Sequence, residues 1–179
     1  MKMSVLVLSV GLLFAVLASG QKAKSQKELD ILLEIQHATD PDLLVAAVHN
    51  LLFTFKNTEF KEWANQKAMT AYSQLNDFEN MLLYGEETLA INPNNVDVLV
   101  KLAYAIPTRT KEFDFDKEEK LSKAEDFARK ALRIIPIVEK PRPDLLDEEW
   151  LNVKSDLLAE AHNALALVAF HRKDFEAAE

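Results

Sequence analysis

The scarcity of glycine constrains the fold of this chain more than any other feature of its sequence. The 179 residues include 3 glycines, and Gly11 and Gly20 both fall in an apolar stretch at the N-terminus, which leaves Gly85 alone in the remainder. Tight hairpin turns, phosphate-cradling loops and dinucleotide-binding motifs all depend on glycine, because its backbone adopts conformations that a Cβ atom forbids. The sequence therefore argues against folds and enzymes built on such turns.

The six prolines indicate helices separated by short breaks. Proline costs about 3 kcal/mol inside a helix, and each proline here stands between stretches of three- and four-residue apolar spacing: Pro41, Pro93, Pro107, Pro136, Pro141 and Pro143. Ser25 and Asp116 are each followed three residues later by glutamate, which is typical of a capping box, and Asp40 precedes a proline. The fold class predicted is all-α, with helices over residues 25–38, 41–55, 58–74, 78–91, 95–106, 117–134, 147–170 and from 174 onward.

Residue types needed for catalysis or metal binding are missing or badly spaced. Cysteine is absent, which excludes disulfides and thiolate sites. No two histidines have the spacing that places two ligands on one helix face, the four being His37, His49, His162 and His171. The acidic run that begins at Asp114 imitates a calcium loop, but Glu119 stands where that loop needs glycine. We therefore expect a protein that is not an enzyme, with no catalytic residues, cofactor or metal, although a helical enzyme with an unrecognised site is an alternative.

Residues 1–20 are predicted to be a signal peptide. Lys2 provides a positive start, an apolar run extends over residues 4–17, and Ala18-Ser19-Gly20 has the small residues that precede a cleavage site. The alternative is an uncleaved membrane anchor, although the run falls short of the roughly 20 apolar residues of a membrane span. Both interpretations place the remaining chain outside the cytoplasm, and the expected location is the periplasm. The formal net charge of −8, with no basic block, argues against nucleic acid as a partner, and membrane association is expected only if residues 1–20 are retained.

Similar segments recur after residue 58. The first helices of these segments carry pairs of large and small residues, in AMTAY (68–72), LAYA (102–105) and LALVA (165–169). Asp-Phe ends a polar turn at 77–78 and again at 174–175. The most specific segment is AINPNN at 90–95. This pattern resembles the tetratricopeptide repeat (TPR), a helix–turn–helix unit of about 34 residues. The resemblance implies tandem antiparallel hairpins stacked as a right-handed α-solenoid. It predicts an N-terminal helix pair at 21–58 and repeats at about 59–95, 96–136 and 147–179. The last repeat is incomplete, so we expect the chain to be a fragment of a longer array.

In TPR proteins the first helices of the repeats line a concave groove that holds a protein or peptide. Carried over to the matching helices, this implies a partner-binding groove formed by Trp63, Gln66, Thr70, Ser73, Asp97, Val100, Tyr104, Glu160, Asn163, Leu167 and Phe170. Tyr104 and Trp63 stand out because aromatic residues dominate interface hot spots. The expected function is an exported scaffold that binds a protein or peptide partner. The alternative is a structural subunit of an envelope complex, anchored by an uncleaved N-terminal helix.

Overall fold

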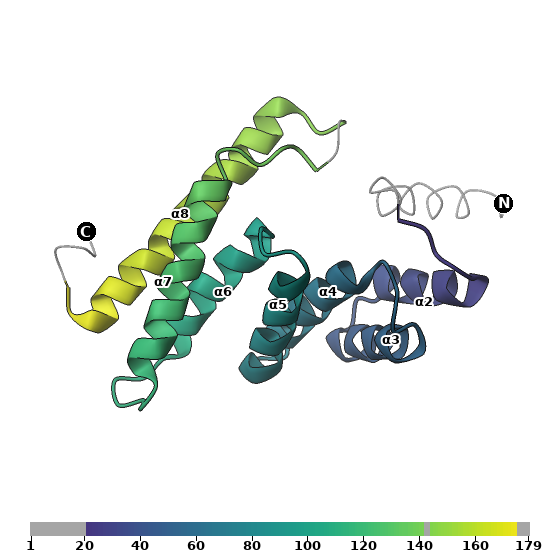
Figure 1. Cartoon of the computed structure of the whole chain (residues 1–179), viewed down its shortest axis with the longest axis horizontal. Helices are drawn as coiled ribbons and strands as arrows, with labels where there is room; N and C mark the ends of the chain where they lie inside the picture. The colour runs from purple at the N-terminus through teal and green to yellow at the C-terminus, as the bar shows by residue number, and fades with distance from the viewer. Residues whose placement is uncertain (1–20, 142–143, 175–179) are drawn as a thin grey trace. The chain divides into compact units, whose positions relative to one another are not determined.

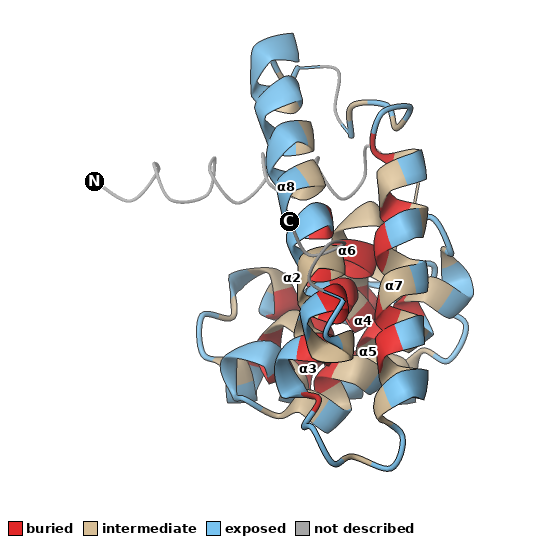
Figure 2. Ribbon diagram, turned by 90° about the vertical axis from the view of Figure 1, so that its left-hand side faces the viewer, coloured by how far each residue is buried: buried red, intermediate tan, exposed pale blue. Residues whose placement is uncertain are grey.

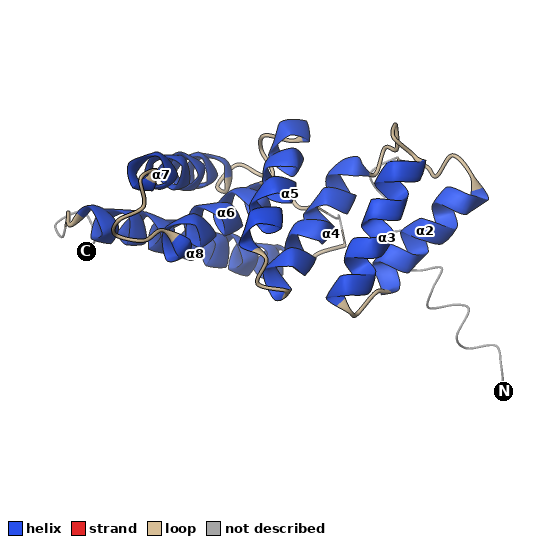
Figure 3. Cartoon of the chain, turned by 90° about the horizontal axis from the view of Figure 1, so that it is seen from below, coloured by secondary structure: helices blue, strands red, loops and turns tan. Residues whose placement is uncertain are grey.

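A computed structural model describes residues 21–141 and 144–174, and in this part of the chain all regular structure is helical (Figure 3). The all-α prediction is thereby confirmed. The predicted signal peptide lies outside the described residues, and so does the helix expected from residue 174 onward, except for Asp174 itself. The chain divides after Ile91 into two compact units, which we call the N-terminal unit and the C-terminal unit.

Within residues 21–91, the N-terminal unit is a series of four helices, each of which packs chiefly against its neighbours in sequence. Its core is formed by apolar side chains from all four helices, with Val48, Leu51, Phe60 and Met69 at most 1% exposed. The helices are α2 (Gln26–His37), α3 (Pro41–Thr54), α4 (Lys61–Gln74) and α5 (Phe78–Ile91) (Figure 1).

A buried carboxylate fastens the start of α2 to the loop before α4. The Glu28 side chain is fully buried, and its Oε1 accepts a hydrogen bond from the Thr58 hydroxyl at 2.7 Å. Its Oε2 accepts the backbone N–H of Lys24 at 2.6 Å, while the Lys24 ammonium donates to the Asn57 carbonyl. A buried charge is tolerated when its oxygens are hydrogen-bonded in this way. The segment before α2 is thus held on the loop at 57–59.

The described residues of the C-terminal unit form three helices, and each packs against the other two. Ala103, Ala128 and Ala164, one from each helix, form a fully buried cluster, and Phe127 and Leu165 pack against it. Alanine at all three positions allows the backbones to approach closely. Buried residues, coloured red, recur along the ribbons of α6 and α7 (Figure 2). The helices are α6 (Val96–Arg109), α7 (Lys117–Ile134) and α8 (Asp147–Arg172).

Two predictions about helix ends are correct. The Ser25 hydroxyl accepts the N–H of Glu28, and the Asp40 carboxylate accepts the N–H groups of Asp42 and Leu43. In a regular capping box the glutamate accepts the backbone N–H of the N-cap residue, here Ser25. Glu28 accepts the backbone N–H of Lys24 instead.

Two further predictions about helix ends are wrong. Asp116 makes no capping hydrogen bond, because its carboxylate pairs with Lys120 at 2.9 Å instead. Pro107 lies inside α6, which was expected to end before it. Proline has no N–H to donate to the carbonyl four residues earlier, yet α6 continues past Pro107 to Arg109. Thr110 then closes the helix, with its N–H and its hydroxyl both donating to the Ile106 carbonyl.

The loop between α6 and α7, residues 110–116, is held by ion pairs but carries two exposed aromatic rings. Glu112 pairs with Lys117 at 2.7 Å and with Lys173, after α8, at 3.0 Å. Phe113 and Phe115, in contrast, project from the surface with their rings exposed.

Candidate functional site

Four of the predicted groove residues come together in the C-terminal unit. Tyr104 on α6 and Asn163, Leu167 and Phe170 on α8 line one cavity of about 400 Å³, and Ala166 completes the lining. All five residues are uncharged, and four of them offer apolar or aromatic surface. A cavity of this size and composition is suited to an apolar side chain, with the Asn163 amide as a hydrogen-bonding group beside it. We call this cavity the α6–α8 groove.

The alanine cluster sets the direction in which the groove residues point. Ala103 and Ala164 face the centre of the unit, and successive helix residues are rotated by about 100°. Tyr104, which follows Ala103, is therefore directed away from the core and is 46% exposed, while Phe170 at the other end of the groove is 61% exposed. Helices α6 and α8 thus present two partly exposed aromatic rings on a rigid base.

An ion-pair network fixes the end of α8 beside the groove. The Arg172 guanidinium binds both Glu118 and Glu125 on α7, and it also donates to the Ser122 hydroxyl at 3.0 Å. Hydrogen bonds from Arg172 lower the pKa of both carboxyl groups from the usual 4.5, and the two glutamates in turn raise the pKa of Arg172. The network is therefore fully ionised at neutral pH, and it holds the turn that carries Phe170 against α7.

The remaining predicted residues of the C-terminal unit lie outside this cavity. Val100 is fully buried, so the prediction that it faces a groove is wrong. Packing explains the error, because α6 is covered by both α7 and α8 and so buries more than one face. Asp97 pairs with Lys101 one turn later at 2.8 Å, and Glu160 is exposed on α8 about one turn before Asn163.

The four predicted residues of the N-terminal unit lie along α4 and do not belong to the α6–α8 groove. Trp63 is half-buried, with the Lys67 ammonium 5.8 Å from its ring centroid, which is within the range of a cation–π contact. Gln66 is half-buried, and its backbone carbonyl accepts a hydrogen bond from the Thr70 hydroxyl at 3.1 Å. Ser73 is exposed in the last turn of the helix.

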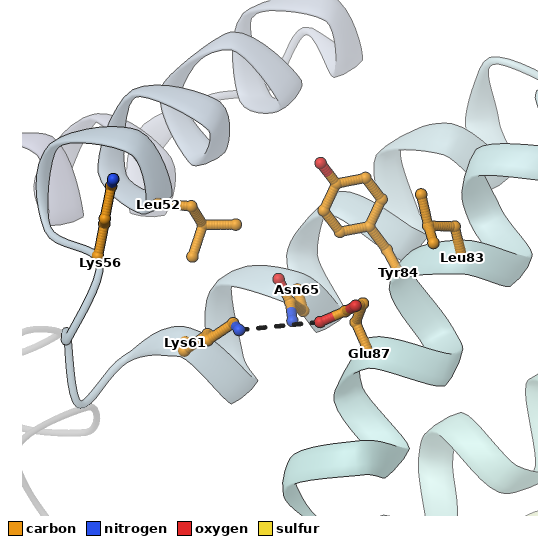
Figure 4. Close-up of a pocket in the computed structure, with 7 residues that line it drawn as sticks. All are labelled: Leu52, Lys56, Lys61, Asn65, Leu83, Tyr84 and Glu87. Atoms are coloured by element: carbon orange, nitrogen blue, oxygen red, sulfur yellow. Dashed lines mark ion pairs between the residues drawn. The ribbon is translucent and has the colours of Figure 1, made fainter.

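The N-terminal unit contains a second cavity, of about 370 Å³, that the sequence did not predict (Figure 4). One signal was present, since Asn65 is a polar residue among the buried alanines of α4, but the packing of α3 against α4 and α5 was needed to complete the lining. We call this the α3–α5 cavity, and its lining residues are Leu52, Lys56, Lys61, Asn65, Leu83, Tyr84 and Glu87.

Across the described ranges, no three acidic or histidine side chains are gathered as metal ligands, and no helix there has both the length and the apolar content to cross a bilayer. The acidic residues that imitate a calcium loop bind a lysine instead, with Asp114 and Asp116 both paired to Lys120. Comparisons of the chain with protein-family models, curated proteins and solved structures gave no match.

Proposed function

We propose that this protein is an exported, non-catalytic scaffold of TPR-like helix hairpins that binds a protein or peptide partner through the α6–α8 groove. The observation that carries the proposal is the meeting of Tyr104, Asn163, Leu167 and Phe170 around one cavity. Asn163, Leu167 and Phe170 share one face of α8, whereas Tyr104 comes from α6 and is distant from them in sequence. The repeat pattern selected Tyr104 together with these three residues, so its position beside them supports that pattern. The partner that fits is a peptide with an apolar or aromatic anchor and a backbone group that binds Asn163.

The turns that follow α4 and α8 support the repeat interpretation. Asn76 and Lys173 both have a positive φ, 57° and 62°. The next N–H in each turn reaches back to the same relative carbonyl, from Asp77 to Tyr72 at 3.0 Å and from Asp174 to Ala169 at 2.9 Å. These are two Schellman motifs at matching positions of the sequence pattern. Equal turns after two first helices are expected of a repeated hairpin.

The test begins with the full chain, expressed for export with a C-terminal tag and used to select peptides from a displayed random library. We expect the selected peptides to share an apolar or aromatic anchor. Tyr104→Ala and Phe170→Ala should each weaken their binding by at least about tenfold, as expected for hot-spot aromatics. Phe115→Ala is the matched control, because it removes an exposed ring outside the groove and should leave binding unchanged.

The outcomes separate this function from its alternatives. Equal binding by Tyr104→Ala, Phe170→Ala and the parent would reject the groove as the binding site. Failure to select any peptide would reject a peptide-binding function. Mass spectrometry of the same exported protein shows whether residues 1–20 have been removed, as we propose, and their retention would favour an anchored structural subunit instead.

A further inference from the structure

The α3–α5 cavity has a feature that the α6–α8 groove lacks, namely a buried polar group without a partner. Asn65 is 1% exposed, and its amide nitrogen Nδ2 makes no hydrogen bond. A buried donor that makes no hydrogen bond lowers the free energy of unfolding, so native structures rarely retain one without a reason. Because Asn65 lines the cavity, an acceptor group on a bound ligand would satisfy this donor.

The charges around the cavity favour an anion. Lys56 and Lys61 bring two cations, and Glu87 brings one carboxylate. The Lys61 ammonium lies 3.8 Å from the Glu87 carboxylate, which is longer than a hydrogen bond, and no ion pair within the described part of the chain engages Lys56. The lining thus has a formal excess of one positive charge beside an unused N–H donor.

The other walls of the cavity are apolar and rigid. Leu52 from α3 and Leu83 from α5 provide aliphatic surface, and the ring of Tyr84 lies between these two side chains (Figure 4). The Tyr84 ring is stacked on Tyr72 with centroids 5.4 Å apart, and the Tyr84 hydroxyl is 2.8 Å from Nε2 of His49. Burial raises the pKa of Tyr84, so its hydroxyl stays neutral and does not repel an anion.

We propose that the α3–α5 cavity binds a small organic monocarboxylate with an apolar body. The carboxylate accepts hydrogen bonds from Asn65 Nδ2 and from Lys56, which together supply a neutral and a charged donor. The apolar body lies against Leu52, Leu83 and the Tyr84 ring. This site is independent of the peptide-binding function, since every residue of its lining belongs to the N-terminal unit.

The proposal is tested with three probes that share one skeleton and differ in charge. Binding of 3-phenylpropionate, 3-phenylpropanol and 3-phenylpropylamine to the full chain is measured by calorimetry, and the Asn65 side-chain amide is followed by NMR. We expect the acid to bind at least about tenfold more tightly than the alcohol, as one charge-assisted hydrogen bond provides, and to shift the Asn65 amide resonances. The amine should bind least.

Variants then assign the binding to this cavity. Lys56→Gln, at an exposed position that should not disturb folding, is expected to weaken binding of the acid by about tenfold. Lys67→Gln is the matched control, because Lys67 lies on the same helix as Asn65 but over Trp63 and outside the cavity, and it should bind as the parent does. Glu87→Gln should strengthen binding, since it removes the anion that competes for Lys61.

Several results would overturn the proposal. Equal affinity for acid and alcohol would show that only the apolar walls attract ligands, and tighter binding of the amine would make Glu87 the anchor. Absence of binding by the acid, or equal losses in Lys56→Gln and Lys67→Gln, would remove the site. None of these results bears on the α6–α8 groove, whose own test uses different residues.

Discussion

The two units of this protein are built from the same kind of helix but are packed in different ways. In the N-terminal unit the principal contacts join helices that follow one another in sequence, whereas in the C-terminal unit α6, α7 and α8 each contact both of the others. A series of neighbour contacts makes each helix depend on one or two others, while a closed set of three makes every helix depend on all the rest. A destabilising substitution should therefore spread to fewer helices in the N-terminal unit than in the C-terminal unit.

The packing also relates to what each unit offers a ligand. Neighbour packing in the N-terminal unit leaves a cavity bordered by three helices, with a buried amide donor and charged groups at its edge. Closed packing around three alanines in the C-terminal unit leaves an uncharged groove between two helices, bordered by exposed aromatic rings. One region of the chain is thus suited to a small charged molecule and the other to an apolar side chain.

The largest expected effect comes from truncating one fully buried leucine in each unit. Leu51→Ala in α3 and Leu102→Ala in α6 should each lower the free energy of unfolding by about 2–5 kcal/mol. Hydrogen exchange should then rise in α2, α3 and α4 for Leu51→Ala with α5 least affected, but in all of α6, α7 and α8 for Leu102→Ala. An equal rise over all four helices of the N-terminal unit would contradict the proposed difference in cooperativity.

A smaller effect is expected from the buried carboxylate of the N-terminal unit. Glu28→Ala leaves the Thr58 hydroxyl and the Lys24 N–H without their acceptor, and it should destabilise the protein by about 1–3 kcal/mol. Glu28→Gln retains one acceptor oxygen and should cost less. Thermal melting gives the comparison, with Glu34→Ala as the control because Glu34 is exposed on the same helix. If Glu34→Ala is as harmful as Glu28→Ala, the buried bonds are not the cause.

The smallest expected effect is a difference in pH response between the units. In the C-terminal unit the folded-state pKa values of Glu118 and Glu125 lie below 4.5, so the stability they contribute is present above pH 4.5 and is lost as the pH falls through the lowered values. In the N-terminal unit the folded-state pKa values of Tyr72 and Tyr84 lie above 10.0. Their contribution is therefore complete below pH 10.0 and is lost as the pH rises through the raised values.

Variants make this pH response measurable. Melting temperature is measured as a function of pH. Arg172→Met should reduce the loss of melting temperature at acid pH, because it removes the partner that lowers both glutamate pKa values. Tyr84→Phe should reduce the loss of melting temperature at alkaline pH and leave the loss at acid pH unchanged. The comparison fails if either variant changes both sides of the profile equally.

The sequence predicted the features that depend on local interactions. Helix class followed from apolar spacing and the caps at Ser25 and Asp40 followed from their own side chains, because these interactions lie within a few residues. Asp116 was mispredicted because a cap competes with any cation nearby, and Lys120 takes its carboxylate.

Long-range packing accounts for the features that the sequence did not predict. Val100 was assigned to a surface because its spacing does not reveal that two helices cover α6. The α3–α5 cavity was missed because Leu52, Asn65 and Tyr84 come from three helices, and nothing local to any of them indicates the other two. Local sequence also does not reveal that Tyr104 of α6 lies beside Asn163, Leu167 and Phe170 of α8, and these four residues were grouped in advance only through the resemblance to a repeat.

The loop at 110–116 has a consequence for how the C-terminal unit tolerates a broken chain. Its exposed Phe113 and Phe115 are natural cleavage points for a chymotrypsin-like protease, while the loop base is held by Glu112 and the helices by the alanine cluster. Cleavage there would break the covalent connection between α6 and α7 without removing any packed side chain. The C-terminal unit should therefore persist as two associated fragments, which makes this loop the natural position at which to divide the protein into complementing halves.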